Sequence, residues 1–159
     1  MTLRFLKGAP AARRDELVVE TAAGATRTCD LPRQGVLPRL AVHFVVESTL
    51  GWRHGAISAL QDPSRALNPA GVPLLGAADT DRPAADALVE SLEAEQWAGA
   101  STFARFQARL EQTCAQSGAP VPAINAEQLT ALRLALREFG AAWRPLLPGA
   151  RLELTFPEC

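Results

Sequence analysis

Apolar residues follow two different periods along this chain, and the order of those periods limits the folds that it can adopt. Residues 2–6, 16–21 and 26–31 largely alternate between apolar and polar side chains, which is the period of a β-strand. Gly24 lies between the second and third segments and permits the positive φ of a tight turn, so these two segments predict a hairpin. Residues 152–156 alternate in the same way and predict a closing strand.

Between these ends, the apolar residues recur at the spacing of helices. An apolar segment runs from about residue 37 to residue 50 and is followed by Gly51, a typical helix end. A second, short helix is predicted over residues 54–60.

Three longer amphipathic helices are predicted in the second half of the chain. The first covers residues 83–97, the second begins at Ser101 as its N-cap, and the third opens with a capping box of Asn125 and Gln128. In the first of these helices the charged residues are expected to face outward, namely Asp86, Glu90 and Glu93.

These elements predict a single α+β domain over residues 1–159. Its small antiparallel sheet consists of the N-terminal strand, the hairpin and the C-terminal strand, and four to five helices cover it. A long proline-rich loop over residues 61–83 interrupts the helical part. A connection of this length without periodicity is typical of a lid, a binding loop or a mobile segment, and a tolerated insertion is the simpler alternative.

Composition excludes several classes of protein. At 48% hydrophobic and 21% charged residues, the chain is ordinary globular material. Its formal charge of −1 argues against nucleic acid or an anionic membrane as a partner.

Because the sequence shows neither a long apolar segment nor a secretory leader, we expect a soluble, cytoplasmic protein. The frequent use of arginine suggests a bacterial source. Three cysteines without C-x-x-C spacing are expected as buried thiols: Cys29, Cys114 and Cys159.

The stretch VHFVVESTLGWRHG, residues 42–55, holds both histidines of the chain. On a helix, Arg39, His43 and Glu47 form one narrow polar row, because they are four residues apart and most other positions are apolar. Two interpretations fit this row. It faces water and supports the helix through weak ion pairs, or it forms a site in which His43 and Glu47 act together.

As a site, the row suits two kinds of chemistry. His43 and Glu47 could hold a divalent metal ion with His54 as the third ligand. That arrangement requires a sharp turn at Gly51, since in a continuous helix His54 lies about 10 Å beyond Glu47. Without a metal, His43 beside a carboxylate suits general-base chemistry, with Trp52 as a wall of the site.

No sequence signature identifies a catalytic residue, a metal ligand or a cofactor. The chain lacks a G-x-G-x-x-G segment after a strand, a P-loop, an H-E-x-x-H segment and a nucleophile elbow. The candidate polar site consists of the four residues singled out above, His43, Glu47, Trp52 and His54. The sequence does not assign a cofactor.

Residues 37–55, LPRLAVHFVVESTLGWRHG, resemble a motif of small uncharacterised bacterial proteins, P-H-D-x-x-H-Y/F-x-V-E followed by G-F-W-G. The end of the chain, WRPLLPGARLELTFP, is similar to their W-x-x-L/V-x-P-G-x-x-L-x-L-x-W/F-P. The chain departs from the first motif at residues 39–40 and 56–58. The resemblance implies a small domain with strands first, a His/Glu helix next and a Pro-Gly turn into a last strand, and it carries no function. The matching residues are Pro38, His43, Phe44, Val46, Glu47 and Gly55.

Two functions stay open at this point. The first is a non-enzymatic binding or interaction domain, in which the loop over residues 61–83 or an apolar helix face meets a protein partner or a second copy. The second is a metal-assisted or His/Glu-dependent enzyme that acts on a small molecule through His43 and Glu47. We favour the first.

Overall fold

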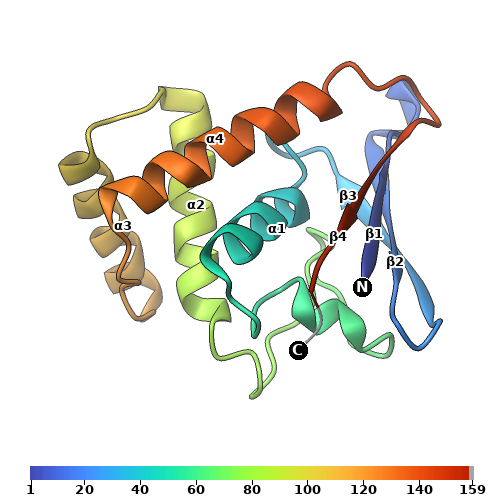
Figure 1. Ribbon diagram of the computed structural model, residues 1–159, viewed down its shortest axis with the longest axis horizontal. Helices are drawn as coiled ribbons and strands as arrows, with labels where there is room; N and C mark the ends of the chain where they lie inside the picture. Colours follow the sequence, from blue (N-terminus) through green and yellow to red (C-terminus); the bar gives the residue numbers. More distant parts are fainter. Residues whose placement is uncertain (158–159) are drawn as a thin grey trace.

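The computed structural model describes residues 1–157. Its four strands form one antiparallel sheet in the order β3-β2-β1-β4 (Figure 1). In the register of β1, Leu3 lies opposite Val19 on one side and opposite Leu154 on the other. The predicted α+β fold is confirmed, with the hairpin and the closing strand in one sheet. The strands are β1 (Thr2–Leu6), β2 (Arg14–Glu20), β3 (Thr26–Pro32) and β4 (Arg151–Thr155).

Four α-helices of the described chain lie on one side of this sheet. α1 lies beside the sheet, α2 packs next to α1, α3 lies farthest away, and α4 crosses above them (Figure 1). Phe5 of β1 packs edge-to-face against Phe139 and Trp143 of α4, which joins the sheet and the helices in one core. The helices are α1 (Arg39–Leu50), α2 (Arg82–Ala98), α3 (Phe103–Ser117) and α4 (Ala126–Trp143), and the short 3₁₀ segments are η1 (Pro10–Ala12) and η2 (Ser58–Gln61).

The helix ends follow the sequence closely. Gly51 ends α1 in the left-handed region at φ 70°, as predicted. Asn125 and Gln128 form the predicted capping box at the start of α4, each side chain accepting from the backbone amide of the other. Within residues 1–157, none of the helices combines the length and the apolar character that a membrane span requires.

Two local predictions are wrong. The N-cap of α3 is Thr102 and not Ser101, because the amide and hydroxyl of Ser101 are bound to the buried Glu95. The short helix predicted over residues 54–60 is reduced to the 3₁₀ turn of η2 (Ser58–Gln61), because the backbone amides before it are bound by side chains from other segments.

The proline-rich loop packs along the outer edge of β3. Arg27 of β3 donates to the backbone carbonyls of Asp62 and Arg65. Gly71 lies so close to the backbone of Asp30 that a Cβ at this position would come within 2.1 Å of the Asp30 carbonyl oxygen. The loop therefore covers one edge of the sheet, and an isolated bridge between residues 67 and 73 holds its own turn together.

Candidate functional site

His43 and Glu47 lie on the face of α1 that packs against α2, and neither side chain has exposed surface. The interpretation in which this row faces water is therefore wrong. α2 brings its own acidic residues to the row, since Asp86 lies against His43 and Glu93 pairs with Arg39. The expectation that Asp86 and Glu93 face outward is wrong for the same reason: both are half-buried in the α1–α2 interface.

The His43 ring lies between two carboxylates. Its Nδ1 is 3.3 Å from Glu47 Oε1 and its Nε2 is 3.2 Å from Asp86 Oδ1, although neither contact has the alignment of a good hydrogen bond. Burial alone would lower the pKa of His43, but contact with Asp86 and with Glu47 outweighs it, so the pKa of this imidazole is raised. The protonated ring is therefore the form that this environment favours.

Arg82 completes this cluster on the side of α2. Its Nε lies 2.9 Å from both carboxylate oxygens of Asp86, and its Nη1 donates to the carbonyl of Pro73 at 3.0 Å. Burial raises the pKa of Asp86, but His43 and Arg82 more than offset this effect and hold the pKa below its usual value. We call His43, Glu47, Asp86 and Arg82 the polar centre.

Glu47 holds the chain that follows α1. Its Oε1 accepts from the amide of Ala56 at 2.7 Å and its Oε2 from the amide of Ile57 at 3.0 Å. Gly55 lies directly against this carboxylate, and a Cβ there would come within 2.4 Å of the Glu47 carboxyl carbon. Both oxygens of Glu47 therefore accept from the backbone amides that lead into η2.

The sharp turn at Gly51 does form, but it does not bring the His54 side chain to the polar centre. The backbone amide of His54 donates to Asp81 at 3.0 Å, and its side chain is exposed. Trp52 is half-buried and packs against the hydrophobic core. Of the four predicted site residues, the structure brings together His43 and Glu47. In residues 1–157, no group of three or more His, Cys, Asp or Glu side chains is arranged to hold a metal ion.

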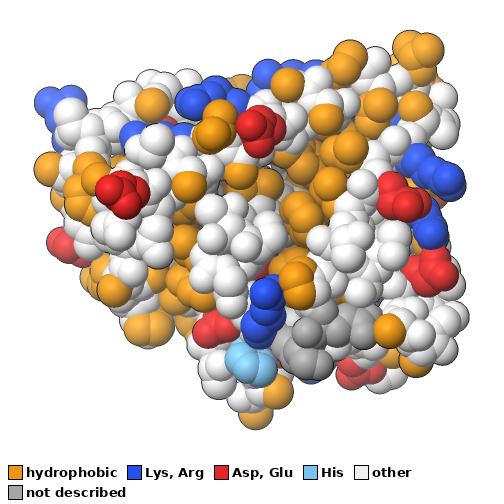
Figure 2. All heavy atoms as spheres, viewed as in Figure 1, with side chains coloured by type: hydrophobic (Ala, Val, Ile, Leu, Met, Phe, Trp, Pro, Cys, Tyr) orange, Lys and Arg blue, Asp and Glu red, His pale blue; other side chains and the backbone are white. Residues whose placement is uncertain are grey.

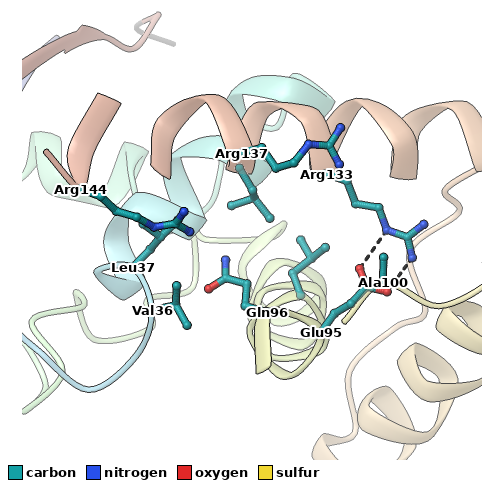
Figure 3. A pocket seen from close by; sticks show the side chains of 10 residues that line it. Val36, Leu37, Glu95, Gln96, Ala100, Arg133, Arg137 and Arg144 are labelled. Atoms are coloured by element: carbon teal, nitrogen blue, oxygen red, sulfur yellow. Dashed lines mark hydrogen bonds and ion pairs between the residues drawn. The ribbon is translucent and has the colours of Figure 1, made fainter. Parts of the chain in front are cut away.

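A second polar arrangement lies between α2 and α4, where a pocket of about 240 Å³ opens (Figure 3). One side is lined by Arg133 and Arg137 of α4 and by Arg144, which directly follows that helix. The other side is lined by Glu95 and Gln96 of α2. We call this the arginine pocket. Its apolar lining includes Val36, Leu37, Leu92 and Leu136.

Within the arginine pocket, Glu95 and Arg133 are paired. Arg133 Nε donates to Glu95 Oε2 at 2.9 Å, and a second nitrogen of the same guanidinium donates to Oε1. Burial raises the pKa of Glu95, but the bonds from Arg133 and from the Ser101 amide outweigh this, and the pKa is lowered. Glu95 is therefore an ionised carboxylate whose charge Arg133 balances.

The sequence analysis did not identify this pocket. The available signal was the spacing of Arg133, Arg137, Gly140 and Arg144, which places all four on one face of a helix. The partner surface on α2 and the loop before α1 follow only from the packing of the helices.

Comparisons with protein-family models, with curated proteins and with solved structures found no match to this chain. The resemblance to small bacterial proteins therefore stays a prediction. Its matching residues His43, Glu47 and Gly55 meet in one place in the structure.

Proposed function

We propose that this protein is a non-enzymatic interaction domain that pairs with a second copy of itself through the edge of β4. The observation that carries this proposal is an edge strand that, within residues 1–157, pairs with β1 alone and lies next to an apolar groove. Exposed strand edges favour pairing with another chain, because their backbone donors and acceptors lack partners.

The two edges of the sheet differ in this respect. The proline-rich loop covers β3, whereas β4 pairs only with β1 in the described chain. The amine of Met1 donates to the carbonyl of Phe156, and the amide of Phe156 donates to the carbonyl of Met1, so these two residues form a hydrogen-bonded pair. Along an antiparallel ladder, hydrogen-bonded pairs alternate with pairs that are not hydrogen-bonded. With this alternation, the backbone groups of Arg151, Glu153 and Thr155 point away from β1, toward the open edge.

The groove lies between β4, α1 and α4 and has a volume of about 300 Å³. Leu152 and Leu154 of β4 are only half-buried, and Phe44 of α1 lies beside them. Figure 2 shows apolar side chains gathered between α4 and β4 on this face of the molecule. A strand added at the edge of β4 would direct alternate side chains into this groove.

Charge complementarity favours a second copy as the added strand. If two β4 strands pair antiparallel around Leu152, Arg151 of each copy lies opposite Glu153 of the other on the solvent face. Both residues are exposed, and opposite charges across a strand pair stabilise it. Glu153 also pairs with Arg4 of its own β1 at 2.7 Å, so the Arg151 of the second copy would add a second cation beside this carboxylate. The same register places Leu152 opposite its own equivalent above the groove.

The environment of His43 and Glu47 supports a structural role more than an enzymatic one. Both side chains are fully buried, and Glu47 already accepts two backbone hydrogen bonds. A substrate would have to displace α2 or η2 to reach them. The polar centre therefore supports the non-enzymatic alternative.

We also propose that the chain belongs with the small bacterial proteins that it resembles, and that it is cytoplasmic. The meeting of His43, Glu47 and Gly55 supports the first proposal, because the motif then describes one packed unit. The second is supported by Cys29 and Cys114, which are buried free thiols of a kind that reducing compartments preserve. Cys159 lies outside the described residues.

A charge-swap experiment tests the proposed pairing. Arg151→Glu and Glu153→Arg each place like charges opposite one another in the homodimer, and each should weaken self-association by about tenfold or more. Mixing the two variants restores opposite charges and should produce a heterodimer. Sedimentation velocity with one variant labelled by a fluorophore measures both effects. Arg105→Glu, a charge reversal on the exposed face of α3, is the matched control.

Two outcomes would overturn the proposal. One is a wild-type protein that stays monomeric at all accessible concentrations. The other is an Arg151→Glu variant that associates as strongly as the Arg105→Glu control.

A further inference from the structure

The arginine pocket contains more positive charge than its own acidic residues balance. Arg133 is bound to Glu95, but within residues 1–157 no carboxylate forms an ion pair with Arg137 or Arg144. Both side chains are exposed at the mouth of the pocket. These two unpaired guanidinium groups lie next to an apolar surface. A small organic anion could therefore place its charged group on the arginines and its apolar part on that surface.

The apolar part of the pocket lies between the two helices. Leu92 of α2 is buried, Leu136 of α4 is nearly so, and Leu37 comes from the segment before α1. The volume of about 240 Å³ exceeds the roughly 150 Å³ of a cavity that accepts benzene. A ring or a short alkyl chain therefore fits together with a charged group.

Gly140 creates the space that Arg144 occupies. A Cβ on Gly140 would lie 3.2 Å from Nη2 and 3.3 Å from Cζ of Arg144, so the guanidinium folds back over this glycine. Figure 3 shows Arg144 pointing into the pocket from the end of α4 and Gln96 pointing into it from α2. Glycine inside a helix normally destabilises it, and here it allows a cation to lie over the apolar surface.

We propose that the arginine pocket binds a small carboxylate with an apolar body. The carboxylate would accept from the guanidinium of Arg144 and from that of Arg137, and the amide of Gln96 offers a further donor. The apolar body would pack on Leu92 and Leu136. This site is separate from the edge of β4 and does not depend on pairing between copies.

Binding of three matched probes to the full chain tests the proposal by isothermal titration calorimetry. We expect 3-phenylpropanoate to bind. Acetate, which lacks the apolar body, and 3-phenylpropanol, which lacks the charge, should each bind at least about tenfold more weakly. Absence of binding by 3-phenylpropanoate, or equal binding of either control, would overturn the proposal.

Variants locate the site. Arg144→Gln and Arg137→Gln should each weaken binding of 3-phenylpropanoate by about tenfold. Gly140→Ala should weaken it by a smaller factor, about twofold to fivefold, because the new methyl group displaces the Arg144 guanidinium without removing it. Arg105→Gln on α3 is the control and should leave binding unchanged. If Arg144→Gln binds as tightly as this control, the assignment of the pocket is wrong. Self-association, measured in the same samples, should not change.

Discussion

The polar centre and the arginine pocket are built from the same kinds of residue on neighbouring helix faces, yet they differ in how their charges are balanced. In the polar centre, His43 lies between Glu47 and Asp86, and both carboxylates have further partners. In the arginine pocket, Glu95 balances Arg133 alone, and two more arginines remain at an open mouth. This difference indicates that the first region holds the fold together and that the second is available for a ligand.

The largest expected effect comes from removing the carboxylate of the polar centre. Glu47→Ala leaves the amides of Ala56 and Ile57 without acceptors and leaves His43 with one carboxylate in place of two. Breaking a buried pair of this kind costs about 3–5 kcal/mol of unfolding free energy. Urea denaturation measures this loss, and a change below about 0.5 kcal/mol would contradict the structural role of Glu47.

Adding one methyl group beside the same carboxylate should have the next largest effect. Gly55→Ala forces a Cβ to within 2.4 Å of the Glu47 carboxyl carbon, and that carboxylate is fixed by two hydrogen bonds. We expect a loss of about 1–3 kcal/mol in the same assay. Gly35→Ala is the matched control, because its nearest heavy atom would be 3.4 Å away and its effect should stay near zero. Equal effects in the two variants would argue against close packing at Gly55.

The stability of the polar centre should also depend on pH. Because the pKa of His43 is raised above its unfolded value of 6.5, its contribution is complete below that pH and is lost as the pH rises through the folded pKa. The pKa of Asp86 is lowered from 3.8, so its contribution is present above that pH and is lost as the pH falls through the folded pKa. Urea denaturation from neutral to alkaline pH should show the first loss in the wild type. This loss of unfolding free energy should be absent in His43→Gln. If the variant shows the same pH dependence as the wild type, another titrating group causes the loss.

The smallest effect has the opposite sign and belongs to the arginine pocket. Gly140→Ala removes a glycine from the interior of α4, and the group that the new Cβ meets is the flexible end of Arg144. The helix should gain about 0.5–1 kcal/mol in unfolding free energy. A rise in melting temperature together with weaker 3-phenylpropanoate binding would show that Gly140 favours the pocket at the expense of stability. A fall in melting temperature would show that Arg144 cannot move aside.

What the sequence predicts well are the features that depend on neighbouring residues in the chain. Alternation placed all four strands, and local cap chemistry placed Gly51 and the capping box of Asn125. What it missed depends on how separate elements meet. The periodicity of α1 shows that His43 and Glu47 share a face, but only the packing of α2 decides that this face is buried.

The same limit explains the other differences. Asp86 and Glu93 were expected on the solvent side of α2, because a single helix reveals its apolar stripe and not the polar row of its neighbour. The proline-rich loop has no period at all, so its packing on the edge of β3 follows from contacts with Arg27 and Asp30 that the sequence does not indicate.

Hydrogen exchange at the amides of Ala56 and Ile57 tests the structural role of the polar centre most directly. These two amides lie in an irregular segment before η2, and Glu47 is their acceptor. If the centre is a closed structural unit, both amides should exchange as slowly as those of the buried Leu3 and Phe5 in β1, through global unfolding alone. Exchange at the rate of exposed loop amides would contradict the account, because it would show that the Glu47 carboxylate opens to water in the native protein.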